Sequence, residues 1–189
     1  MTLYKDKYRV ETNRLRHWDY ASEGFYFVTI CTYERLCLLG AIDNGIMQMS
    51  PAGEIVAEEW LKTGSLRKNV MLDKWVVMPN HFHAIIAITN TKSGSTNDSS
   101  QRETSQRETS QRDVSTGLKP DSLGSIINQF KSACTKKIQA AGHDFGWQTR
   151  YYDHVIRNEK SLEEIRGYII NNPLKWELDK INPANYNHT

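Results

Sequence analysis

Residues 70–88, VMLDKWVVMPNHFHAIIAI, contain two apolar runs that are separated by Pro79 and Asn80. Proline cannot donate a ladder hydrogen bond, and Pro-Asn favours a turn, so the sequence predicts two paired antiparallel strands over 70–78 and 81–88. The second strand begins with a His-Phe-His triplet at 81–83. Because successive side chains of a strand point to opposite faces, both imidazoles should lie on one face of the sheet and the phenyl ring on the other.

The chain before this hairpin supplies three more candidate strands. The stretch GFYFVTICT at 24–32 is rich in aromatic and β-branched residues, which favour a buried or half-buried strand. Apolar runs at 36–42 and 46–49 flank an Asn-Gly pair, which is a strong signal for a tight hairpin turn. Five strand candidates therefore precede residue 89.

Three helices are predicted from apolar residues at helical spacing. The first begins after a serine cap at Pro51 and ends before Gly64, and the second runs from a cap at Ser122 to Gly142. The third begins at Ser161, where an S-x-x-E capping box precedes an apolar stripe, and ends ahead of a proline. Strands and helices together indicate an α+β fold in which helices pack on an antiparallel sheet.

Residues 89–117 differ in composition from the rest of the chain. They are almost entirely polar, with Val114 as their one apolar residue, and SQRET occurs twice in tandem and begins a third time at Ser110. Such a segment cannot build a core, so we predict a mobile, disordered linker inside one catalytic domain that spans 1–189.

Bulk properties limit the class of protein. The 189 residues carry a net charge of +2, which is only mildly basic, and no apolar run approaches the roughly 18 residues needed to span a bilayer. The N-terminus lacks the apolar region of a secretory signal, so the sequence predicts a soluble, cytoplasmic protein with no membrane partner. Three cysteines without CxxC spacing predict neither a disulfide framework nor a zinc site.

The N-terminal stretch mixes basic and aromatic side chains. Arg14 and Arg16 lie there among tyrosines, a histidine and a tryptophan, a combination that suits contact with a nucleic-acid backbone and stacking on its bases. A solvated arm with a few packed aromatic residues is equally compatible with this segment.

Two groups of residues have the character of a catalytic site. Two neutral imidazoles side by side, His81 and His83, form half of a metal site, although two histidines on a strand can also hydrogen-bond to neighbours. Tyr168 and Asn172 are four residues apart and lie on one helix face, where they present a phenol and an amide oxygen. The alternative is that Tyr168 packs beside Ile165 and that Asn172 ends the helix.

The chain resembles the REP-associated tyrosine transposases, within the single-tyrosine HUH transposase family. The matching stretches are FYFVTICT near the start, WVVMPNHFHAII at 75–86, WQTRYYDHVIRN at 147–158 and YIINNPLKW at 168–176, in the family's order. A histidine triplet after VVMPN followed much later by Y-I-x-x-N-P is more specific than either piece. The stretches span most of the chain outside the polar insertion.

The resemblance implies a ferredoxin-like sheet that carries the triplet on a central strand. It makes Tyr168 the catalytic nucleophile and makes His81, His83 and Asn172 the ligands of Mg2+ or Mn2+. The asparagine is a departure from part of the family, since relatives also use glutamine at the position of Asn172. The expected product is a covalent 5′-phosphotyrosine with a free 3′-hydroxyl. The expected partner is single-stranded or hairpin DNA, cleaved and rejoined by a monomer with a cis site, although other relatives are domain-swapped dimers. We expect DNA contacts from Arg14, Arg16, Lys131, Lys136, Lys137 and Arg150.

Two other functions remain open from the sequence. One is a non-catalytic nucleic-acid-binding module, against which the intact triplet and Tyr168 argue. The other is a metal-dependent hydrolase of small molecules, which would leave Tyr168 and Asn172 without a role. The neighbouring segment Tyr151–His154 is predicted to form a strand or turn with structural or DNA-contacting side chains and no chemistry of its own.

Overall fold

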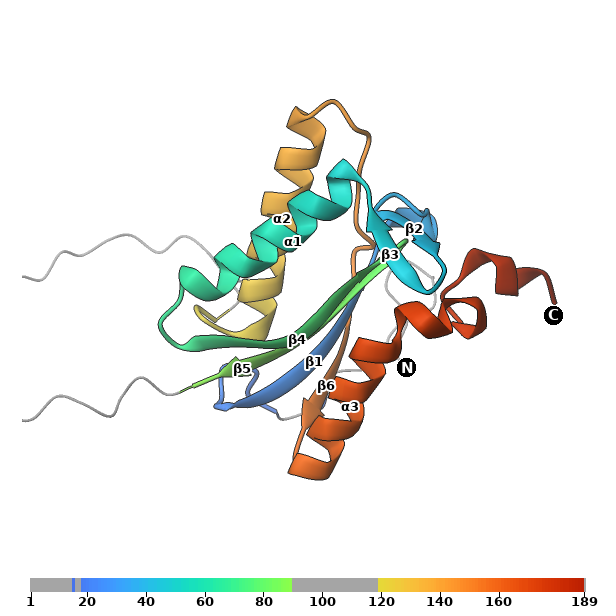
Figure 1. The fold of residues 1–189 in the computed structure, drawn as a ribbon. Coiled ribbons are helices and arrows are strands. Elements are labelled where there is room, and N and C mark those ends of the chain that lie inside the picture. The colour runs from blue at the N-terminus through green and yellow to red at the C-terminus, as the bar shows by residue number, and fades with distance from the viewer. Residues whose placement is uncertain (1–14, 16–17, 90–118, 189) are drawn as a thin grey trace, which may run out of the picture.

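The computed structural model describes residue 15 and residues 18–89 and 119–188, without the side chains of 186–188 (Figure 1). In chain order the elements are strand β1 (Gly24–Cys31), the short 3-10 helix η1 (Tyr33–Arg35), strands β2 (Gly40–Asp43) and β3 (Ile46–Met49), helix α1 (Pro51–Ser65), strands β4 (Val70–Met78) and β5 (His81–Ile88), helix α2 (Leu123–Ala140), strand β6 (Tyr152–Ile156), helix α3 (Glu159–Asn171), and the 3-10 helices η2 (Pro173–Leu178) and η3 (Pro183–His188).

Four strands form an antiparallel sheet in the order β4-β5-β1-β6, and β2 and β3 form a separate hairpin. The helix α1 connects β1 with β4, by way of the small hairpin, and α2 connects β5 with β6. This is the predicted α+β, ferredoxin-like arrangement, with the histidine triplet on the central strand β5. All eight residues of β5 are buried, because helices cover the sheet on both faces.

The two faces of the sheet bury different side chains. On one face α1 and α2 cover Phe82, whose ring lies 5.1 Å from that of Trp60 and 5.5 Å from that of Phe130, measured between centroids. On the other face α3 packs on a smaller apolar cluster that includes Phe27 and Ile85. The imidazoles of the triplet belong to the α3 face, as the alternation of the strand predicted, because the ring of His83 stacks on that of Phe27 in the smaller cluster, with centroids 5.3 Å apart. Helix α3 lies across the sheet from α1 and α2 (Figure 1).

The strand predictions are confirmed for 70–78 and 81–88, and the small hairpin turns at Asn44 and Gly45, whose φ angles of 49° and 76° suit an Asn-Gly turn. The prediction that a strand begins at residue 36 is wrong. Glu34 and Arg35 adopt left-handed φ angles that turn the chain, and β2 starts only at Gly40. The segment around Tyr152 forms the sixth strand.

The second helix agrees with its prediction, because Ser122 caps it and Gly142, with φ of 87°, follows its end. The first continues past its predicted end before Gly64, through to Ser65. A Cβ at Gly64 would lie 2.8 Å from Leu72, so this glycine lets the end of α1 approach β4.

The predicted start of the third helix at Ser161 is wrong, since α3 begins at Glu159. The side chain of Asn158 caps it by accepting a hydrogen bond from the Ser161 backbone N–H at 2.8 Å, so the capping box does not form.

Three predictions lie outside the described residues. They are the polar linker, apart from its first residue, and the DNA contacts of Arg14 and Arg16. Among the helices that are described, none combines the length and the apolar composition required to cross a membrane.

Candidate active site

Two buried imidazoles form the centre of the site. His81 and His83 are almost fully enclosed, and their ring centroids are 4.5 Å apart. Burial lowers the pKa of His81 to about 4, although the nearby charge of Asp179 acts in the opposite direction. Burial, and then the proximity of His81, places the pKa of His83 well below its ordinary value. Both rings are therefore neutral near pH 7, which is the form that binds a metal.

Asn80 fixes which nitrogen of His81 carries the proton. Its amide Nδ2 donates to the backbone carbonyls of Arg35, at 3.0 Å, and Ile181, at 2.9 Å. Its Oδ1 is therefore the atom that faces Nδ1 of His81, at 2.9 Å, and an amide oxygen can only accept. Nδ1 of His81 thus carries the hydrogen, and Nε2 keeps its lone pair.

The lone pair of His81 faces other acceptors. Nε2 of His81 and Oδ1 of Asn172 are both buried and have no hydrogen-bond partner among the described residues. The Asn172 amide is close enough to raise the pKa of His81, and Oδ2 of Asp179 lies 3.9 Å from His81 Nε2. Buried polar atoms without a partner are costly, and a cation between these converging acceptors would satisfy them.

The spacing of these acceptors suits a single ion. The ligand atoms of His81, His83 and Asp179 all lie within 4.8 Å of one another. Ligands held at about 2.0–2.6 Å from a hard cation are separated by at most about 4–5 Å. The residues present therefore fit a divalent metal, and Asp179 extends the ligand set that the sequence predicted.

Tyr168 closes the open side of this cluster. Its hydroxyl is 3.1 Å from Nε2 of His83, whose Nδ1 is 2.8 Å from the Thr29 hydroxyl. The side chain is 44% exposed, and its ring packs edge-on against Phe27. Burial raises the pKa of the Tyr168 phenol, the charge of Asp179 adds to this, and the Asn172 amide opposes it. A cation beside the phenol would instead lower its pKa.

An ion pair joins the tyrosine helix to the sheet. Nε of Arg166 donates to both carboxylate oxygens of Asp73, at 3.1 and 3.0 Å, and a third bond runs from its Nη2. Asp73 lies where the pairing of β4 with β5 shifts register, between Leu72 and Trp75. The irregularity in β4 thus places the carboxylate of Asp73 against Arg166 of α3, which precedes Tyr168 by two residues in the sequence.

The structure brings together all four residues that were predicted as nucleophile and ligands: Tyr168, His81, His83 and Asn172. Sequence reasoning missed Asp179, which follows η2 in an irregular segment and has no motif around it. It also missed the role of Asn80, which had been interpreted only as a turn residue.

The cations predicted to contact DNA from α2 lie on the face of the sheet opposite to this site (Figure 1). Nζ of Lys131 donates to the backbone carbonyls of Gln148 and Thr149, and Lys137 forms an ion pair with Glu59 at 2.5 Å. Lys136 is exposed on the same helix, and Arg150 is exposed just before β6. Contact of these residues with DNA stays a prediction.

Comparison with known proteins gives a relative in sequence and solved structures with a related fold. No model of a protein family matches the chain. An uncharacterized protein of Haemophilus influenzae is 39% identical over 169 residues, which cover 89% of this chain and 90% of that protein. The solved structure of a REP-associated tyrosine transposase bound to a REP hairpin matches 90% of this chain and 77% of its own with a TM-score of 0.57 and 21% identity. The chain therefore belongs to one family with the Haemophilus influenzae protein and has the fold of a REP-associated tyrosine transposase.

Proposed function

We propose that this chain is a metal-dependent transposase of the REP-associated tyrosine kind, which cleaves and rejoins single-stranded DNA beside hairpins. One observation carries the proposal: the hydroxyl of Tyr168 lies 3.1 Å from Nε2 of His83, at the open side of a buried cluster of metal-ligand atoms. Nucleophilic catalysis requires such a hydroxyl next to a group that increases its acidity.

The ligands that we propose for the metal are His81, His83 and Asn172, with Asp179 as a fourth. Imidazole nitrogens together with carboxylate and amide oxygens suit Mn2+ or Mg2+. Bound there, the cation would act as a Lewis acid that lowers the pKa of the phenol and offsets the negative charge that develops on the phosphate.

Tyr168 acts as the nucleophile. Its phenolic oxygen attacks the scissile phosphorus in line, the P–O3′ bond breaks, the phenol loses its proton to solvent, and the departing 3′ oxygen takes one up. The products are a 5′-phosphotyrosine and a free 3′-hydroxyl. Attack by a 3′-hydroxyl on the phosphotyrosine reverses the same steps and joins strands without an external energy source.

The exposure of Tyr168 supports a single strand as the substrate. The helix-borne phenol must approach one phosphate along the line of the breaking bond, and a paired second strand would obstruct that approach. The transposase with the same fold was solved with a REP hairpin, which agrees with the expected hairpin partner. Tyr168 packs on the sheet of its own chain, 3.1 Å from His83, which is the arrangement that a monomer with a cis site requires.

Covalent capture tests this function. The protein is incubated with Mn2+ and labelled single-stranded oligonucleotides that carry hairpins from the host genome, and the products are separated under denaturing conditions. We expect an adduct whose nucleotide maps to Tyr168 and which the Tyr168→Phe variant does not form. Tyr152→Phe is the matched control, since it removes a hydroxyl from another exposed tyrosine of the same sheet face and should form the adduct normally.

The competing functions predict other results. A hydrolase that uses water would cleave without an adduct, and a binding module would retain the hairpin without cleaving it. His81→Ala and His83→Ala should each abolish metal-dependent cleavage and leave hairpin binding largely in place, since phosphate contacts elsewhere supply most of the affinity. Full activity of either variant would remove the metal site from the mechanism.

A further inference from the structure

The 3-10 helix η2 connects two of the candidate metal ligands. Asn172 occupies its N-cap position and Asp179 its C-cap position. Asn172 is also fixed by α3, which ends at the residue before it, whereas the chain reaches Asp179 only after η2. The conformation of η2 therefore determines where the carboxylate lies relative to the other ligands.

Trp176 is the residue of η2 that lies against the site. The centroid of its ring is 6.0 Å from that of His81, and the side chain is half-buried. The backbone carbonyl of Trp176 accepts from the N–H of Asp179 at 3.1 Å and from the side-chain amide of Asn182 at 3.0 Å. Trp176 thus packs beside one candidate ligand with its ring and holds the turn that carries another with its carbonyl.

Hydrogen bonds after η2 orient the carboxylate of Asp179. Its Oδ1 accepts from the N–H of Ile181 at 2.7 Å, and its Oδ2 is the oxygen that lies 3.9 Å from Nε2 of His81. The Ile181 carbonyl in turn accepts from Asn80 at 2.9 Å. The carboxylate therefore has a defined orientation although it lies outside the regular helices and strands.

The β2–β3 hairpin contacts the start of η2. A Cβ on Gly45, in the hairpin turn, would lie 2.6 Å from Cδ2 of Leu174 and 3.6 Å from its Cα. The φ angle of Gly45 is 76°, so this glycine allows both the left-handed turn and the close approach of η2. The helix η2 is thus held at two points, by the hairpin turn at Leu174 and by His81 at Trp176.

We propose that η2 positions Asp179 as a ligand of the metal. Trp176 holds η2 beside His81, and the contact of Leu174 with Gly45 holds its start. The proposal rests on the proposed function and adds positioning residues outside the set of ligands. A carboxylate on an unsupported segment loses conformational freedom when it binds a cation, and that loss weakens binding. A carboxylate that η2 already holds near His81 avoids most of this loss.

Metal binding in the absence of DNA tests the proposal separately from catalysis. Calorimetry measures the affinity of the full chain for Mn2+. We expect Trp176→Ala to weaken binding about tenfold, since residues that orient a ligand contribute about 10–100-fold to metal affinity. Trp176→Phe keeps an aromatic ring beside His81 and should restore most of the affinity.

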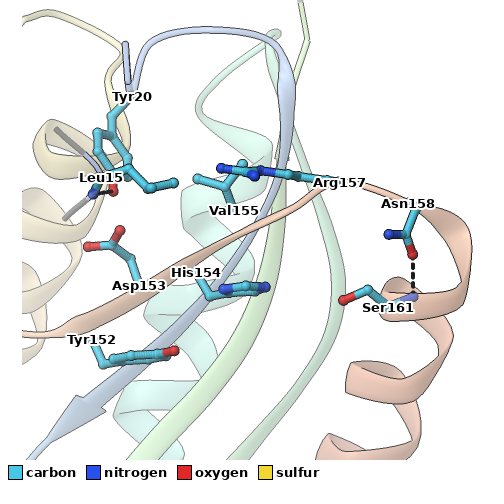
Figure 2. A pocket seen from close by; sticks show the side chains of 9 residues that line it. All are labelled: Leu15, Tyr20, Tyr152, Asp153, His154, Val155, Arg157, Asn158 and Ser161. Carbon is cyan, nitrogen blue, oxygen red and sulfur yellow. Dashed lines mark hydrogen bonds between the residues drawn. The ribbon is translucent and has the colours of Figure 1, made fainter. Parts of the chain in front are cut away.

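A double-mutant cycle shows whether Trp176 acts through Asp179. Asp179→Asn weakens the ligand, and in that background Trp176→Ala should cause little further loss, because both changes remove one contribution. Losses that add in full would mean that Trp176 only stabilises the fold, which would overturn the proposal. The matched control is Tyr152→Ala, which removes a ring that lines the pocket at the edge of β6 (Figure 2) and packs on Phe27. It should bind Mn2+ like the wild type.

The contact with the hairpin is tested by the size of the side chains. Gly45→Ala places a methyl group against Leu174 and should weaken Mn2+ binding several-fold, whereas adding Leu174→Ala makes room for that methyl and should restore part of the affinity. Asn44→Ala strains the same turn at the neighbouring residue, whose φ is 49°, and so separates strain from contact. If Gly45→Ala binds Mn2+ as tightly as Asn44→Ala, the hairpin does not hold η2 and this part of the proposal is refuted. A wild-type chain that binds Mn2+ but forms no tyrosine adduct would refute the proposed function and leave these results unchanged.

Discussion

Replacing Asn80 should damage the site without touching a ligand. The Asn80→Ala variant removes the hydrogen-bond partner of the buried Nδ1–H of His81 and one donor to each of the half-buried backbone carbonyls of Arg35 and Ile181. Loss of the hydrogen bond costs about 1–3 kcal/mol at the buried His81 and about 0.5–1.5 kcal/mol at each half-buried carbonyl, so the free energy of unfolding should fall by about 2–6 kcal/mol. Urea denaturation in metal-free buffer measures this loss.

The same variant frees His81 to change its tautomer, so that Nε2 no longer presents a fixed lone pair. Loss of such an orienting partner typically weakens metal binding about 10–100-fold, which calorimetry with Mn2+ detects. Asn80→Asp separates the two effects, because it keeps the acceptor for His81 and loses both donors, and should therefore bind Mn2+ well in a destabilised protein. Thr29→Val, which removes one hydrogen bond to His83, should cost about 1 kcal/mol. The reasoning fails if Asn80→Ala costs no more than Thr29→Val, or if it binds Mn2+ as tightly as the wild type.

Three further predictions concern pH, the tyrosine helix and the polar insertion. The pKa of His81 is 6.5 in the unfolded chain and about 4 in the folded one, so its contribution to stability is complete above pH 6.5 and is lost as the pH falls towards 4, a change of about 3 kcal/mol. Urea titrations of metal-free protein should show the free energy of unfolding falling over this pH range, and His81→Gln should reduce that fall. Arg166→Met should lower the melting temperature and the adduct yield, with hairpin binding retained. Exchanging the pair as Asp73→Arg with Arg166→Asp should recover part of both, and no recovery would mean that the ion pair does not position α3. Deleting residues 93–115 should leave the melting temperature and DNA cleavage nearly unchanged, because a polar repeat buries no apolar surface. A large loss in either would assign this segment a structural or DNA-binding role.

The fold was predictable where a local pattern has one physical solution. Alternation along 81–83 determined which face of the sheet holds the imidazoles, and the Asn-Gly pair determined the hairpin turn. Helix starts were less certain because neighbouring residues compete as caps. Asn158 and Ser161 can each cap a helix, and the helix that starts earlier gains additional backbone hydrogen bonds.

The site was predictable only where its residues lie in a recognisable spacing. His81 and His83 share a strand face, and Tyr168 and Asn172 share a helix face, so each pair could be identified from the sequence. Asp179 lies in an irregular segment, and its approach to His81 depends on how the chain packs after α3. No periodicity encodes such a contact between residues that are distant in the sequence.

The route of the chain through the site has a consequence for its synthesis. The histidines lie near the middle of the sequence, whereas Tyr168, the proposed nucleophile, follows much later. Asp179 and the Ile181 carbonyl that accepts from Asn80 come from the last segments. Because the chain leaves the ribosome from its N-terminus, the proposed metal ligands on β5 emerge long before the proposed nucleophile. A chain that terminates between β5 and α3 therefore contains both histidines and lacks Tyr168, so that under the proposed function such a product could not form the covalent adduct.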